Sequence, residues 1–185
     1  MKIVMISGSR NRQGKTASMA EAALRGAAAA GCQCERFFLP ELAMERCRQC
    51  DEDGWGDCRA KGACVIEDDF ARLVGAIRQA DAALFANPVY FSDLSESMRA
   101  FLDRLRRITR HESARPGIEG KPALGVCVAG GGGGGAPSCA ESLEKTLRAS
   151  GLDIQAVFPV RRQNMDLMEQ ALEAAGRWLA RQQPA

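Results

Sequence analysis

Four of the eight cysteines fall within one short segment of the 185-residue chain. They are Cys47, Cys50, Cys58 and Cys64, separated by two, seven and five residues. Four thiolates in one segment can hold a [4Fe–4S] cluster or a structural zinc ion. Zinc sites usually contain two closely spaced pairs, and here only Cys47 and Cys50 are close. The other interpretations are a redox-active or partly disulfide-bonded loop and thiols that bind nothing.

Acidic residues surround these cysteines. Residues 41–69 contain nine acids and four bases, a net charge of −5. Negative charge would repel an anionic iron–sulfur cluster and lower its reduction potential. Residues 99–121 have the opposite balance, with seven bases, three acids and a net charge of +4. That basic segment is either a solvated surface or a docking site for an anionic cofactor or a neighbouring subunit.

A second chemically useful segment covers residues 7–16, with the sequence Ser-Gly-Ser-Arg-Asn-Arg-Gln-Gly-Lys-Thr. It lies between a short apolar run and an alanine-rich run, which predicts a loop at a helix N-terminus. Exposed backbone N–H groups at such a terminus bind phosphate. Ser9 and Thr16 offer hydroxyl donors, and Arg10 and Lys15 add positive charge. The segment therefore predicts a phosphate site.

Two nucleotide-binding motifs do not fit this segment. The dinucleotide motif G-x-G-x-x-G fails because Arg10 occupies its second glycine position. The Walker motif matches at Gly14-Lys15-Thr16, but Ser9 occupies its first glycine position, and no later strand ends in an acid that could hold magnesium. A P-loop-like nucleotide hydrolase is therefore a remote alternative, and a turn that binds nothing is another.

Two further segments favour a flat ligand. In Asn87–Asp93, Pro88 fixes a turn and Tyr90 and Phe91 supply two aromatic side chains. Six consecutive glycines, Gly130–Gly135, follow an apolar run. Glycine lets a backbone approach a ligand closely and adopt positive φ, so both segments are candidates for walls of a ring site. The alternatives are core packing of the aromatic residues and a flexible linker.

These segments alternate with apolar runs of strand and helix period. Strands are predicted over Lys2–Ile6, Cys34–Leu39, Ala82–Ala86, Pro122–Ala129 and Leu152–Phe158. Helices are predicted over Lys15–Ala30, Asp68–Gln79, Ser95–Arg107, Ser138–Ala149 and Asp166–Arg181. The alternation predicts an α/β domain whose parallel sheet is covered on both faces. Because ligands bind beyond the carboxyl ends of such strands, the loops after the first, third and fourth strands are expected to form one site.

The composition bounds the class of protein. With 46% hydrophobic and 26% charged residues, the chain is expected to form one globular domain over residues 1–185. No run approaches the roughly 20 apolar residues of a transmembrane helix, and polar residues 7–10 exclude a signal peptide. We therefore expect a cytoplasmic protein with reduced thiols. The net charge of +2 predicts neither a nucleic acid nor a membrane partner, and the single histidine, His111, excludes a hydrolase triad.

The ordered set of motifs resembles the flavodoxin-like NAD(P)H-dependent FMN reductases, and more narrowly the iron–sulfur flavoproteins. The matching pieces are Gly8–Thr16, the cysteines running into Asp68-Asp69, Asn87–Phe91, Phe101–Arg104 and the glycine-rich segment. Together they cover about residues 1–151. The resemblance implies a flavodoxin-like five-stranded parallel sheet of order 2-1-3-4-5, with helices on both faces. It also implies a cysteine-rich insertion, residues 41–66, after the second strand.

The same resemblance implies a bound FMN. Its phosphate would be held by Ser9, Arg10, Gly14, Lys15 and Thr16. Its ring would be held by Pro88, Val89, Tyr90, Phe91, Gly130, Gly131, Gly132 and Gly133. The family also implies a homodimer or homotetramer with the flavin near the interface. Iron–sulfur flavoproteins carry a compact C-x2-C-x2-C-x4–7-C run, and this chain departs from it by a middle gap of seven residues.

The expected function is an FMN-dependent oxidoreductase that moves electrons from NAD(P)H through FMN to an acceptor such as a quinone, a flavin or a metal. No catalytic side chain is required, because the flavin carries the chemistry. The alternative is an electron-transfer protein, in which a [4Fe–4S] cluster on Cys47, Cys50, Cys58 and Cys64 exchanges electrons with a ferredoxin-like partner. The cysteine segment distinguishes the two.

Overall fold

The computed structural model describes residues 1–182, so the last three residues of the predicted domain 1–185 lie outside the described part. Within residues 1–182, five strands form one sheet of order β2-β1-β3-β4-β5, and every neighbouring pair is parallel. The strands are β1 (Lys2–Ser7), β2 (Gln33–Phe38), β3 (Ala82–Pro88), β4 (Pro122–Ala129) and β5 (Asp153–Arg161). This confirms the predicted flavodoxin-like sheet.

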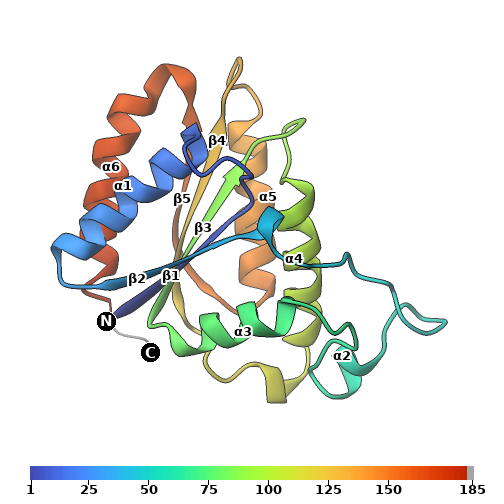
Figure 1. Cartoon of the computed structure of the whole chain (residues 1–185). Helices are drawn as coiled ribbons and strands as arrows, with labels where there is room; N and C mark the ends of the chain where they lie inside the picture. The colour runs from blue at the N-terminus through green and yellow to red at the C-terminus, as the bar shows by residue number, and fades with distance from the viewer. Residues whose placement is uncertain (183–185) are drawn as a thin grey trace.

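Helices cover both faces of the sheet (Figure 1). They are α1 (Lys15–Ala29), α3 (Phe70–Gln79), α4 (Glu96–Ile108), α5 (Ala136–Ala149) and α6 (Met165–Leu179). Helices α1 and α6 pack on one face, and α3, α4 and α5 pack on the other. Since both faces are buried, the central strands β1, β3 and β4 need continuous apolar runs rather than alternating ones. Among residues 1–182, no helix has the length and apolar character to cross a membrane.

The side chains of strand β1 contribute to the hydrophobic cores on both faces of the sheet. Ile3 and Met5 pack with the residues of α1 and α6, whereas Val4 and Ile6 pack with those of α3 and α4. All four side chains are almost fully buried. The run is held centrally because β1 pairs with β2 on one side and with β3 on the other. Burial of this kind is the main stabilising contribution to the fold.

Two glycines bring α1 and α6 into direct backbone contact. A Cβ at Gly26 would overlap the carbonyl oxygen of Glu173, and a Cβ at Gly176 would overlap that of Ala23. Any side chain at either position would force the two helices apart, because protein interiors leave no spare volume. The two helices therefore cover their face of the sheet as one closely packed pair.

The cysteine-rich insertion after β2 extends away from the sheet beside α4 (Figure 1). It contains one helical turn, α2 (Asp57–Ala60), for which no helix was predicted. A buried ion pair ties it to α4: Arg104 donates to Asp68 from Nη1 at 2.6 Å and from Nη2 at 2.9 Å. Asp68 also accepts from the backbone N–H of Glu45 at 2.8 Å. Burial raises the pKa of Asp68, but these hydrogen bonds outweigh it and lower the pKa below its usual value.

Most element boundaries differ from the predicted ones by one to three residues. The strand β3 continues through Asn87 to Pro88, and β5 continues to Arg161. The helix α3 begins at Phe70, two residues after the predicted start at Asp68. The helix α3 starts late because the Asp68 side chain accepts from the backbone N–H of Phe70 at 3.1 Å and also from Arg104. These hydrogen bonds hold Asp68 in front of the first helical residue.

Candidate functional site

The loops after β1, β3 and β4 gather at the carboxyl edge of the sheet (Figure 1). The first and fourth loops are joined directly, because Lys15 Nζ donates to the carbonyl oxygen of Gly130 at 3.3 Å. The first loop is joined to the start of α4, where Ser97 Oγ donates to the carbonyl oxygen of Gly8 at 3.3 Å. The three segments singled out in the sequence therefore lie around one site, as expected for a doubly wound sheet.

The first loop presents the N-terminus of α1 without a side-chain cap. Gly14 is the N-cap residue, and no side chain accepts from the N–H groups of the first turn. Such groups are ready to bind an anion. Ser9 and Thr16 are buried beneath the loop, and Ser9 Oγ donates to the carbonyl oxygen of Asn11 at 3.3 Å. Arg10 is exposed on the loop.

Gly8 fixes the position of this loop against α4. A Cβ at Gly8 would overlap the Ser95 hydroxyl. The Gly8 backbone N–H donates to the carbonyl oxygen of Ala86 at 2.8 Å, which holds the loop against β3 as well. Only glycine allows both contacts, so the path of the loop is set before any ligand binds.

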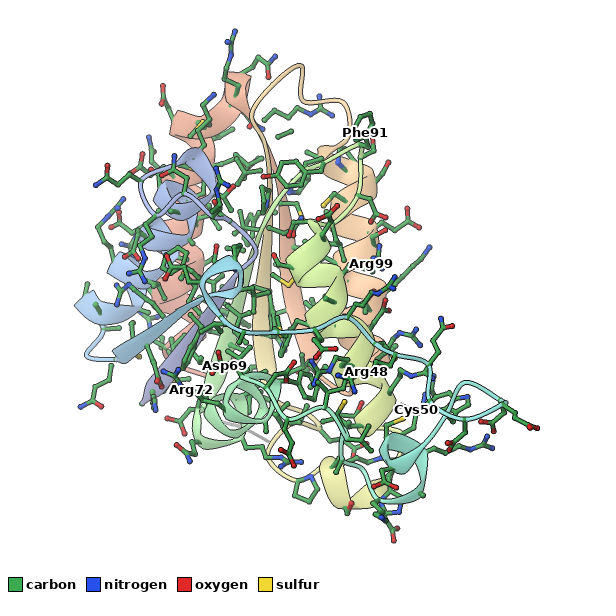
Figure 2. All side chains as sticks on the ribbon, turned by 45° about the vertical axis from the view of Figure 1, so that its right-hand side comes forward. Arg48, Cys50, Asp69, Arg72, Phe91 and Arg99 are labelled. Atoms are coloured by element: carbon green, nitrogen blue, oxygen red, sulfur yellow. The ribbon has the colours of Figure 1, made fainter. Side chains whose placement is uncertain are left out.

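The third loop makes a tight turn with two strained residues. Tyr90 and Asp93 exchange backbone hydrogen bonds of 3.1 and 2.9 Å, with Phe91 and Ser92 between them. Phe91 has φ of 47° and Ser92 has φ of 64°, a left-handed conformation that is uncommon for residues other than glycine. Figure 2 shows Phe91 projecting at this end of the molecule, and its side chain is fully exposed. Strain combined with an exposed aromatic ring is typical of a ligand-facing segment.

A buried polar network supports the third loop. Asn87 Oδ1 accepts from the Ser95 backbone N–H at 3.1 Å and from Ser95 Oγ at 3.0 Å. Its Nδ2 donates to the Pro88 carbonyl at 2.7 Å and to Cys139 Sγ at 3.3 Å. Ser95 in turn caps α4 by accepting from the Met98 N–H at 3.3 Å. The end of β3 and the starts of α4 and α5 are thus held together.

Cys139 is buried in the first turn of α5, and it faces Cys127 of β4. A hydrogen bond from the Cys127 thiol lowers the pKa of Cys139. Burial raises the pKa of Cys139 and so opposes this lowering. The hydrogen bond from the Asn87 side chain lowers the pKa further. The pKa of Cys127 is raised by the same hydrogen bond and by its burial. The lowering of the Cys139 pKa therefore comes mainly from its side-chain neighbours.

An open cleft of about 530 Å³ lies between the first loop, the third loop and the start of α4. Its volume is within the range of roughly 300–1,000 Å³ that is typical of small-molecule sites. The lining residues are Gly8, Arg10, Pro40, Tyr90, Phe91, Leu94, Ser95, Glu96 and Ser97. The cleft combines an apolar aromatic wall with one arginine and several polar groups, which suits a flat ligand that carries an anion.

The predicted flavin-binding residues divide into two sets. Arg10, Tyr90 and Phe91 line the cleft. Those beside it rather than in its wall are Ser9, Gly14, Lys15, Thr16, Pro88, Val89, Gly130, Gly131, Gly132 and Gly133. Pro88 ends β3, and the Val89 N–H donates to the Val128 carbonyl at 3.0 Å, so both belong to the sheet edge. Gly130, Gly131 and Gly132 are exposed, with open space where a Cβ would stand.

Sequence reasoning missed part of the cleft wall. Pro40 follows β2, whose carboxyl end reaches the same edge as the ends of β1 and β3. That parallel register is the signal that places the loop after the second strand at this edge, beside the loops after the first, third and fourth strands. Leu94 and Glu96 also line the cleft, and they carry no chemical signal beyond standing at the start of α4.

The four clustered cysteines line a second, smaller cavity of about 20 Å³. It is bounded by Cys47, Arg48, Cys50, Gly54, Asp57, Cys58, Cys64, Val65, Ile66, Arg104, Arg107 and Ile108. All eight cysteines of the chain are free thiols. Among residues 1–182, no three side chains of His, Cys, Asp or Glu stand close enough together to hold one metal ion. The thiols thus share one cavity, about the size of a water molecule, without forming a finished ligand set.

The cleft and the cavity lie along one helix. Ser97 lines the cleft, whereas Arg104 and Arg107 line the cavity. At about 1.5 Å per residue, the two sites are separated by roughly 10–15 Å of α4. Figure 2 shows the same arrangement, with Phe91 near one end of α4 and Cys50 near the other.

Comparison with known proteins finds related sequences. An iron-sulfur flavoprotein of Archaeoglobus fulgidus is 31% identical over 128 residues, which cover 69% of this chain and 54% of the relative. An iron-sulfur flavoprotein of Methanosarcina thermophila is 28% identical over 152 residues, covering 82% of this chain and 75% of the relative. The chain therefore spans only about half the length of the first of these relatives.

Solved structures share the fold. The NAD(P)H:quinone oxidoreductase from Methanothermobacter marburgensis has a TM-score of 0.69 at 19% identity, with 97% of this chain and 96% of that chain covered. An archaeal flavodoxin has a TM-score of 0.63 at 14% identity, with coverage of 97% and 96%. Residues 1–165 match the family model described as NADPH-dependent FMN reductase. The chain therefore belongs to the NADPH-dependent FMN reductase family, with iron-sulfur flavoproteins among its relatives.

Proposed function

We propose that this protein binds FMN at the carboxyl edge of the sheet and is an NAD(P)H-dependent oxidoreductase. The observation that carries the proposal is that the first loop and the aromatic turn line one cleft of about 530 Å³, while Lys15 joins the first loop to the glycine segment. Membership of the FMN reductase family supports it. When bound, FMN would supply hydride acceptance and electron release to an acceptor of the quinone, flavin or metal class.

In this proposal, the first loop holds the phosphate. The N–H groups at the start of α1, with Ser9, Gly14 and Thr16, donate hydrogen bonds to it. Arg10 and Lys15 supply the charge that makes these contacts stronger than neutral ones. Lys15 already lies between the first and fourth loops, where it donates to Gly130.

The third and fourth loops hold the ring. Tyr90 and Phe91 cover one side with aromatic surface, and Pro88 and Val89 fix where that surface begins. In this proposal the exposed backbone of residues 130–132 covers the other side of the ring, where open space leaves room for a planar ligand, and the buried Gly133 ends that surface. No side chain of the chain has to exchange a proton for this chemistry, and the cleft stays open to a second substrate.

The four clustered cysteines support a second element of the function, a [4Fe–4S] cluster. Two relatives are named iron-sulfur flavoproteins. In this chain Cys47, Cys50, Cys58 and Cys64 line one cavity, and the Nε atoms of Arg104 and Arg107 are buried without a partner among residues 1–182. Free thiols and unpaired cationic donors fit an anionic cluster. Such a cluster would supply single-electron exchange with a redox-protein partner.

The proposal includes assembly into a homodimer or homotetramer in the cytoplasm. The exposed pair Tyr90 and Phe91 stands at the rim of the cleft, where a second copy would cover the aromatic surface. The eight free thiols support a reducing compartment.

An absorption spectrum of protein purified without oxygen, followed by titration with NADPH, tests the function. We expect two flavin bands that bleach on adding NADPH, together with a broad brown absorbance from the cluster. Iron and sulfide analysis of the same sample then measures cluster content. A colourless protein that takes up no added FMN would contradict the flavin assignment. Flavin bands without iron or sulfide, even after reconstitution, would contradict the cluster alone.

A further inference from the structure

Two arginine side chains on α4 present buried N–H groups that have no acceptor. The Nε atoms of Arg104 and Arg107 are shielded from solvent, and neither has a hydrogen-bond partner among residues 1–182. Both side chains line the cavity that the four clustered cysteines share. A buried cationic donor without an acceptor is costly, so such groups are rarely left unpaired. An acceptor at this position would remove that cost.

The remaining contacts hold both guanidinium groups in place. Arg104 is only 1% exposed; it donates to both oxygens of Asp68 and to the Glu45 carbonyl, and its guanidinium lies 4.2 Å from the centre of the Phe70 ring. Arg107 donates from Nη2 to the Gly54 carbonyl, and its guanidinium lies 4.2 Å from the centre of the Trp55 ring. Because guanidinium is planar and rigid, these contacts fix where each Nε–H points.

Three of the acidic residues in and next to the insertion are already paired with basic side chains. Asp68 is used by Arg104, Glu45 pairs with Arg48 at 2.8 Å, and Asp57 pairs with Lys61 at 3.0 Å. The unbalanced donors on the cavity wall are thus cationic, although the sequence around the cysteines is net negative. Charge counted along the sequence predicted repulsion of an anionic group, and the folded arrangement predicts attraction.

From these contacts we infer that Arg104 and Arg107 donate hydrogen bonds to the sulfur atoms of the cluster and raise its reduction potential. The inference rests on the proposed cluster on Cys47, Cys50, Cys58 and Cys64. A cluster with four thiolate ligands is anionic, and reduction by one electron increases its negative charge. Cationic N–H donors therefore stabilise the reduced form more than the oxidised form.

Arg107 is the residue to vary, because removing Arg104 would leave Asp68 as an unpaired buried charge and unfold the insertion. Four variants separate the contributions. Arg107→Gln removes the charge and the Nε–H, and Arg107→Lys keeps the charge but removes the Nε–H. Arg106→Gln removes the same charge from the same helix outside the cavity wall. Trp55→Leu removes the stacking that tethers the loop while leaving Arg107 in place.

The measurement is the reduction potential of the cluster, by redox titration of the full chain, with iron and sulfide content determined for each variant. We expect a lower potential for Arg107→Gln, a smaller decrease for Arg107→Lys, and values near wild type for Arg106→Gln and Trp55→Leu. Equal potentials in wild type and Arg107→Gln at equal cluster content would overturn the inference. So would a shift in Trp55→Leu as large as that in Arg107→Gln. A wild-type protein that takes up no iron or sulfide would instead contradict the proposed cluster itself.

Discussion

Lys15 is the side chain that connects two of the three loops at the carboxyl edge, since it follows the cap of α1 and donates to Gly130. We predict that the double substitution Lys15→Ala with Thr16→Ala weakens FMN binding at least about 10-fold, as the loss of charge-assisted hydrogen bonds to phosphate implies. Fluorescence titration of FMN measures the affinity.

The chain offers a matched control for this change, because Lys145 and Thr146 form the same residue pair on α5, where Lys145 is exposed and pairs with Glu141. Lys145→Ala with Thr146→Ala should leave FMN affinity unchanged. Equal affinities in both double variants would remove the phosphate site from the first loop.

For single residues, the sequence indicated which side chains belong to the site better than it indicated their conformation and contacts. The aromatic pair after the third strand was found, but the left-handed turn at Phe91 and Ser92 was not, because neither residue is one that favours positive φ. The basic segment 99–121 was a candidate docking site for an anionic cofactor, but the contact of Arg104 with the cysteine segment was not predicted. Arg104 stands 36 positions from Asp68, and only the folded chain brings its guanidinium to the cysteines.

At the scale of elements, a substitution in the glycine segment after β4 gives a direct test of the proposed flavin site. A Cβ at Gly132 meets nothing, so Gly132→Val should leave the fold intact while filling the space proposed for the flavin ring. We expect purified Gly132→Val to carry little FMN while its thermal unfolding midpoint stays near that of the wild-type protein without flavin.

Gly134→Val is the control for this substitution, because a Cβ there also stands in open space but outside the proposed ring contacts. It should retain its flavin. Normal flavin content in Gly132→Val would show that the segment is a linker without a binding role.

Periodicity located the strands and helices well, and it failed where side chains changed the local geometry. The strand predicted over Ala82–Ala86 ends before Pro88, yet β3 includes Pro88, which is paired with Val128 of β4. The chain tolerates proline there because it is the final residue of the strand, where a missing N–H costs little. The helical turn α2 was missed because four residues are too few to show a period.

In the whole molecule, the contact between α1 and α6 decides how one face of the sheet is covered. Gly26→Ala would place a methyl group against the backbone of α6, and we predict a loss of at least about 2 kcal/mol in the free energy of unfolding. Urea unfolding with saturating FMN measures it.

Gly75 supplies the comparison, since it lies within α3 with open space around a Cβ. Gly75→Ala should raise stability by roughly 0.5–1 kcal/mol, because alanine is the better helix former. If both substitutions stabilised the protein, the helices would not be in backbone contact.

The contact between α1 and α6 also bears on where this fold can be cut. The family match ends at residue 165, where α6 begins. A fragment trimmed to the matched residues would lose the helix that covers Ile3, Leu84 and Leu124, and would expose a continuous apolar strip to water. The part of the chain that matches the family model therefore ends before the part that is needed for a folded domain. Any relative whose similarity stops at the same residue must cover that strip with a helix of unrelated sequence or with a second chain.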